Sequence, residues 1–213
     1  MNTIKCIEPK FDCKKCNRLY KFRKENVIKF PNYYNKPVRS FGSKFSKLLI
    51  IGLAPGLQGA NKTGRPFTGD FAGELLYSTL LKFNLAKGFY DPKIKNDLKL
   101  KNCRITNVVK CVPPKNKPEG TEVKNCRSFL SEEINAMKNL KIILCLGVVS
   151  HNSTIKSFGL KPKNFIFSHG KKHKINEGVV MINSYHCSRY NTNTGRLNKK
   201  MFEEVFKKIN KLL

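Results

Sequence analysis

The amino-acid sequence predicts an α/β fold, a three-layer α/β/α sandwich around a four-stranded parallel sheet. Four apolar runs rich in β-branched residues are each too short for a helix, which is typical of buried parallel strands. They cover residues 47–51, 103–109, 142–146 and 179–184. Longer stretches with helical character separate them, and strands that alternate with helices form layered domains around a parallel sheet.

The predicted helices cover residues 71–83, 121–139, 148–158 and 198–213, whereas the basic stretch 162–174 is predicted to be a loop. The sequence has no internal repeat. With 213 residues, of which 40% are hydrophobic, the chain can bury one substantial core. We therefore expect a single domain over residues 1–213, in which residues 1–46 form a smaller N-terminal segment.

The chain is strongly basic, with 42 Lys and Arg against 14 Asp and Glu and a formal net charge of +28. Such a charge repels itself unless the partner is a polyanion, so nucleic acid is the expected partner. The alternative is a composition bias of the genome, with most of the lysines on a solvated surface.

Neither a secretory signal nor a membrane span is predicted. Residues 2–15 are polar and charged where a signal would have an apolar core. The longest apolar run, 142–149, is far shorter than the roughly 18 residues that indicate a membrane span. We expect a cytoplasmic, nucleoid-associated monomer.

A glycine-rich loop, residues 52–70, joins the first predicted strand to the first predicted helix and contains five glycines. Glycines let the backbone approach a ligand closely and leave amide donors uncovered. Residues 56–63 nearly fit the phosphate loop G-x-x-x-x-G-K-[ST], but Asn61 replaces its second glycine. No later strand ends in an Asp that could hold magnesium, so an enzyme acting on nucleotide phosphates is disfavoured.

Residues 52–70 resemble the first motif of the uracil-DNA glycosylase superfamily, specifically of its fifth, broad-specificity family. The resemblance continues through NYYNKPVRSFG at 32–42, ITNVVKCVPPKNKP at 105–118 and HCSRYNTNTGRL at 186–197. It implies an enzyme of base excision repair that hydrolyses the N-glycosidic bond of flipped-out uracil, with hypoxanthine and xanthine as further substrates. Double- and single-stranded DNA would both be bound. The alternative is a nucleic-acid-binding module on the same scaffold without catalysis.

A glycosylase must stabilise positive charge on the sugar and negative charge on the departing base, which has to leave the helical stack. The resemblance implies that the flipped base stacks on Phe67, although that residue could also be a core phenylalanine. The amide of Asn107 suits the N3 hydrogen and O4 of uracil, whereas cytosine presents the reversed pattern. A buried Asn at the strand end is the structural alternative. Gly52, Ala54 and Gly56 are expected to line the pocket.

His186 begins the second motif and can donate a hydrogen bond to O2 of the departing base. The resemblance implies functional roles for His186 and for Asn191, five positions later. Asp70 matches the acidic residue that ends the first motif and is expected to position water or to favour the sugar cation. Its competing role is the N-cap of the next helix. Arg189 and Tyr190 are expected to contact DNA, with Tyr190 entering the gap left by the flipped base.

The sequence departs from the superfamily's pattern at four positions. Ala54 stands where the best-known uracil enzymes have a catalytic Asp, and Gly56 where they have a tyrosine beside C5 of the base. Gln58 stands where relatives have a histidine. Cys187 replaces a proline, which predicts a looser His186 loop.

The eight cysteines are expected to include a metal site rather than disulfides. Cys13 and Cys16 form a CxxC pair, and Cys111 and Cys126 form a wider one. A zinc site with four thiolates usually uses two tight pairs, and a 4Fe-4S cluster tolerates uneven spacing, so spacing alone favours the cluster only modestly. The resemblance implies a 4Fe-4S cluster at these four positions, with a structural role. Three other cysteines are not expected to be ligands: Cys6, Cys103 and Cys145.

Overall fold

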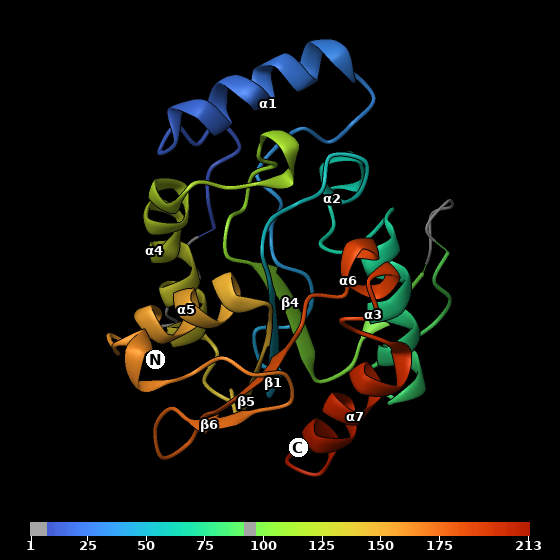
Figure 1. Cartoon of the computed structure of the whole chain (residues 1–213). Coiled ribbons are helices and arrows are strands. Elements are labelled where there is room, and N and C mark those ends of the chain that lie inside the picture. The colour runs from blue at the N-terminus through green and yellow to red at the C-terminus, as the bar shows by residue number, and fades with distance from the viewer. Residues whose placement is uncertain (1–7, 92–96) are drawn as a thin grey trace.

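The computed structural model describes residues 8–91 and 97–213. It confirms the layered α/β fold: a five-stranded sheet lies between two layers of helices (Figure 1). The order across the sheet is β4 (Cys103–Asn107), β1 (Leu48–Gly52), β5 (Ile142–Leu146), β7 (Val180–Ser184) and β6 (Lys172–Lys174). The first four are the predicted strands, and they pair in parallel.

The fifth strand corrects the prediction that residues 162–174 form a loop. β6 pairs antiparallel with β7 at the edge of the sheet, and Pro162–Asn164 form a 3-10 helix. The sequence of β6 is Lys-His-Lys, with both lysines exposed. Charged residues on an edge strand prevent pairing with other chains, so this strand lacks the apolar pattern on which the prediction depended.

The four predicted helices are α3 (Phe71–Lys82), α4 (Gly120–Ala136), α5 (Val148–Ser157) and α7 (Lys199–Asn210). Side chains fix the start of three of them. The carboxylate of Asp70 accepts the Gly73 amide at α3, and Asn198 accepts the Met201 amide at α7. Glu119 and Glu122 form a capping box at α4.

Alternate residues of each central strand face opposite helical layers. In β1, Leu48 and Ile50 belong to the core cluster under α3 and α7, whereas Leu49 and Ile51 belong to the cluster under α4 and α5. All four side chains are fully buried. The sheet is therefore covered on both faces, as its continuous apolar strands predict.

Several elements were not predicted. They are α1 (Asn17–Lys29), α2 (Ala60–Thr63), α6 (Arg189–Asn193), the hairpin β2 (Ala86–Lys87) with β3 (Lys99–Leu100), and a 3-10 helix at Pro114–Asn116. α1 crosses the end of the molecule near α2 and the loop after β4 (Figure 1). β4 also ends two residues before the predicted boundary.

The four parallel strands bring their carboxyl ends to one edge of the sheet. Gly52 of β1 pairs with Asn107 of β4, and Leu146 of β5 with Ser184 of β7. The loops that follow these residues therefore converge, where ligands of such sheets bind. Among the described residues, no helix has the length and apolarity needed to cross a membrane.

Candidate active site

A cavity of about 650 Å³ opens at this edge, between the glycine loop, the start of α3 and the loops after β5 and β7. The structure brings five of the predicted site residues to its wall: Ala54, Gly56, Asp70, His186 and Arg189. It does not bring the other five there: Gly52, Phe67, Asn107, Tyr190 and Asn191.

Asp70 caps a helix and also lines the cavity. Its Oδ1 accepts the Gly73 amide at 3.0 Å and so caps α3, while the residue also lines the cavity. The other oxygen, Oδ2, faces the glycine loop, because a Cβ placed on Gly59 would lie 2.3 Å from it and one on Gly56 would lie 3.2 Å from it. Burial raises the pKa of Asp70, and hydrogen bonds from backbone amides oppose that shift.

His186 follows β7 and reaches the cavity with a neutral ring. Burial lowers its pKa to about 4, so the imidazole keeps one N–H to donate at neutral pH. The ring stacks on Phe67, with centroids 5.8 Å apart and planes at 26°.

Two contacts hold the loop of His186. Asn191 donates its Nδ2 to the carbonyl oxygen of His186 at 2.8 Å. Cys187 is fully buried, and its thiol donates to the carbonyl of Ala72 in α3 at 3.5 Å. The thiol thus contacts α3, and the looser loop expected from the replacement of proline stays a prediction.

Phe67, Asn107 and Gly52 lie together behind the cavity. Phe67 and Asn107 are 6% and 4% exposed. A Cβ on Gly52 would lie 2.4 Å from Asn107 Oδ1 and 2.5 Å from Phe67 Cζ, so only glycine permits this approach. The Oδ1 atom of Asn107 has no hydrogen-bond partner. Buried polar atoms normally have partners, so this unpaired acceptor is an exception, and it does not line the cavity.

Arg189 and Tyr190 begin the short helix α6 at the rim. The Arg189 guanidinium lies 5.5 Å from the ring centroid of Phe71 and lines the cavity. Tyr190 is 72% exposed and is not among the lining residues. Both side chains are accessible to a large partner.

Several lining residues were missed from the sequence: Gln58 as a wall residue, Asn116, Gly147, Val148, Val149 and Ser188. The segment after β5 consists of small and apolar residues, which carry no chemical signal in the sequence. Gln58 is held by Tyr33, whose hydroxyl donates to its Oε1 at 2.5 Å, a contact across 25 positions.

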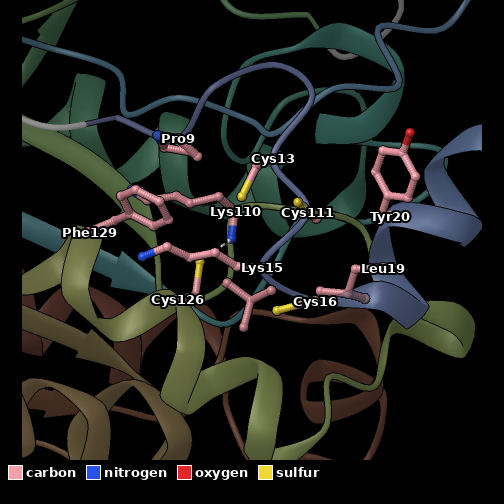
Figure 2. A pocket seen from close by; sticks show the side chains of 11 residues that line it. Pro9, Cys13, Lys15, Cys16, Leu19, Tyr20, Lys110, Cys111, Cys126 and Phe129 are labelled. Carbon is pink, nitrogen blue, oxygen red and sulfur yellow. Dashed lines mark hydrogen bonds between the residues drawn. The ribbon is translucent and has the colours of Figure 1, made fainter.

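Four thiols line a small pocket of about 20 Å³ behind α1 (Figure 2). Cys13 and Cys16 come from the N-terminal segment, Cys111 from the loop after β4 and Cys126 from α4. All four are free of disulfides. The backbone amide of Lys110 donates to Cys126 Sγ at 3.4 Å. The predicted ligand set is thus gathered on one mostly apolar pocket.

In the part of the chain that the structure describes, no three His, Cys, Asp or Glu side chains are arranged to hold a metal ion. The four thiols therefore share a pocket without forming a closed tetrahedral site. Cys103 and Cys145 are buried in strands away from it, as expected. Cys6 lies outside the described residues.

Comparison with known proteins shows the family. The sequence profile of the Uracil DNA glycosylase superfamily matches residues 39–210. A type-5 uracil-DNA glycosylase of Thermus thermophilus is 36% identical over 205 residues, covering 94% of this chain and 93% of that protein. A type-5 enzyme of Pyrobaculum aerophilum is 33% identical over 92% of this chain and 87% of its own, and a type-4 enzyme of Sulfurisphaera tokodaii is 32% identical over 98% and 83%. The chain therefore belongs to the uracil-DNA glycosylase superfamily, and its resemblance to the type-5 branch is confirmed.

Proposed function

We propose that this protein is a uracil-DNA glycosylase, a hydrolase that removes uracil from DNA and leaves an abasic site for base excision repair. Its relatives of type 5 and type 4 carry that activity in their names. The net charge of +28 suits a polyanionic substrate.

The free acceptor of Asn107 is the observation that carries the proposal. Oδ1 of an amide can accept the N3 hydrogen of uracil, while cytosine has no hydrogen at N3. Because Asn107 is buried and pressed against Gly52, its amide has little freedom to turn. If cytosine were bound, this fixed, buried acceptor would stay without a partner, which costs binding free energy. The acceptor therefore supports selection of uracil.

His186 and Asp70 are placed to stabilise the two charges that develop during the reaction. The neutral His186 can donate to O2 as negative charge develops on the departing base. The carboxylate of Asp70 faces the same cavity and can favour the sugar cation or position water. Asn191 contacts the His186 backbone rather than the cavity, so we assign it to positioning His186.

A gel assay with a uracil-containing oligonucleotide, followed by alkali to break abasic sites, tests the proposal. Strand breakage that depends on uracil is expected. Binding of the oligonucleotide without breakage would instead support the non-catalytic binding module.

We further propose that hypoxanthine and xanthine are substrates, because Gly56 leaves the cavity wall open. Gly56→Tyr is expected to lower cleavage of hypoxanthine relative to uracil by roughly tenfold or more, since its ring would fill the space beside the base. The ratio of kcat/KM for the two lesions measures this. An unaltered ratio, or a wild type that acts on uracil alone, contradicts the open wall.

Gly56→Ala is the matched control for that substitution. A Cβ at this position meets Asp70 Oδ2 at 3.2 Å, so both variants move the carboxylate slightly. Only tyrosine adds a wall. A change in absolute rate common to both variants therefore reports the shift of Asp70, and the change of ratio reports the wall.

Tyr190 is proposed to enter the gap that the flipped base leaves in duplex DNA. Tyr190→Ala is then expected to lower activity on duplex by about tenfold, equivalent to about 1.4 kcal/mol, and activity on single strands much less. Tyr190→Phe keeps the ring and should retain activity. Equal losses on duplex and single strands would show that the residue is not a wedge.

We propose that Cys13, Cys16, Cys111 and Cys126 hold a 4Fe-4S cluster with a structural role. The donor set fits, because four free thiols line one pocket whose other walls are mostly apolar. Bound there, the group would tie the N-terminal segment to β4 and α4 and complete a single domain over residues 1–213.

A further inference from the structure

A surface outside the active-site cavity carries aromatic rings paired with cations. We call it the aromatic–basic surface; it consists of the rings of Phe11, Tyr20, Tyr33 and Tyr34 with the cations that lie over them. These cations are Lys36 and Arg39 at Phe11 (4.9 and 4.4 Å), Lys36 at Tyr34 (5.9 Å), Lys62 at Tyr33 (5.5 Å), and Lys14 and Lys24 at Tyr20 (5.6 and 5.7 Å).

A cavity of about 230 Å³ lies within this surface, between α1 and the segments on either side of it. The rings of Phe11 and Tyr20 and the cations Lys24 and Lys36 contribute to its wall. Phe11 is 45% exposed. Among the lining residues only Asp12 is acidic.

The aromatic–basic surface continues from the active site. Gln58 lines the active-site cavity and accepts the hydrogen bond of Tyr33. The next residue, Tyr34, donates its amide to the carbonyl of Lys62 at 3.1 Å. The ring of Tyr34 meets that of Phe11 edge to face, with centroids 6.4 Å apart. These contacts place the aromatic–basic surface beside the active-site cavity, within reach of a strand that leaves it.

We propose that the aromatic–basic surface binds unpaired nucleotides of the DNA strand that carries the lesion, with one base in the 230 Å³ cavity. The proposal rests on the proposed function in one respect, namely that the bound strand is the one that carries the lesion. Flat rings stack on bases of any sequence, and neighbouring cations neutralise phosphates, which is how proteins bind single strands. A base paired within a duplex cannot offer its face to these rings, so the partner is single-stranded DNA.

The test uses the full chain and a labelled single-stranded oligonucleotide without uracil, so binding is measured apart from cleavage. Phe11→Ala is expected to weaken the Kd about tenfold. Phe11→Tyr keeps the ring and should bind as the wild type does. Lys36→Ala leaves the rings and the cysteines in place and should reduce the salt slope of binding by about 0.7.

Phe45→Ala is the matched control. Phe45 is 65% exposed and has Lys44 over its ring at 5.4 Å, but it precedes β1 at the opposite edge of the sheet. It should not change binding. In a cleavage assay on long uracil-containing single strands, Phe11→Ala should raise KM about tenfold and leave kcat unchanged, since the ring lies outside the active-site cavity.

Three outcomes would overturn the proposal. In the first, Phe11→Ala and Phe45→Ala weaken binding of the oligonucleotide equally. In the second, Phe11→Ala does not weaken binding and Lys36→Ala leaves the salt slope of binding unchanged. In the third, Phe11→Ala weakens binding of single-stranded and duplex DNA equally. A wild type that binds the oligonucleotide but never releases uracil would refute the proposed function alone. The effect of Phe11→Ala on binding would then still show whether the aromatic–basic surface binds single-stranded DNA.

Discussion

His186→Ala is expected to slow uracil release by about 10²- to 10³-fold while the Kd for DNA stays close to that of the wild type. A donor aimed at charge that appears only in the transition state contributes to kcat rather than to ground-state binding. Single-turnover cleavage and binding of uracil-free DNA, measured on the same preparations, separate the two quantities.

The pH dependence of cleavage checks which form of His186 acts. Its pKa is about 4, so the ring is neutral at pH 7 and gains a proton only as the pH falls toward that value. The rate should therefore stay level over about pH 6 to 8, where an ordinary histidine would titrate. His186→Gln keeps a neutral donor and should retain more activity than His186→Ala.

Asn191→Ala should also slow cleavage strongly, because the loop of His186 loses the hydrogen bond from Asn191 to its carbonyl. DNA binding should again survive. Unchanged cleavage in both His186→Ala and Asn191→Ala would mean that the segment 186–197 is structural in this protein.

The sheet could be predicted because the burial of a strand requires apolar residues in the sequence. Strands covered on both faces must be apolar throughout, as Leu48, Leu49, Ile50 and Ile51 are. β6 and α1 could not be found in this way. β6 is made of charged residues at an edge, and in α1 only Leu19, Arg23 and Asn26 are buried. Their stability comes from neighbours that no local pattern reveals.

The site was predictable as far as the family motifs and side-chain chemistry reach. Asp70 and His186 stand where parallel strands deliver their loops, and both face the cavity. The free acceptor of Asn107 depends on its packing against Gly52, and the support of Gln58 by Tyr33 depends on a distant segment. Such tertiary contacts have no signature in the order of residues.

Cys111→Ser is expected to lower the yield of soluble, folded protein more than it lowers the rate of uracil release by the protein that folds. Free energy from a structural metal site is folding free energy, since the site does not exist in the unfolded chain. Cys111 joins the loop after β4 to the N-terminal segment through the thiol pocket. A loss of even about 3 kcal/mol would lower the Tm by roughly 6–12 °C in a chain of this size.

Cys145→Ser is the matched control, because Cys145 is also a buried cysteine but lies in β5, where its thiol donates to Thr154 Oγ1 at 3.3 Å. A serine hydroxyl can keep that hydrogen bond, so the metal content should not change. Wild-type protein purified without oxygen should be brown and contain iron and sulfide, and Cys111→Ser should contain less of both. One zinc ion with neither iron nor sulfide, or equal iron in the two variants, would refute the cluster at these four thiols.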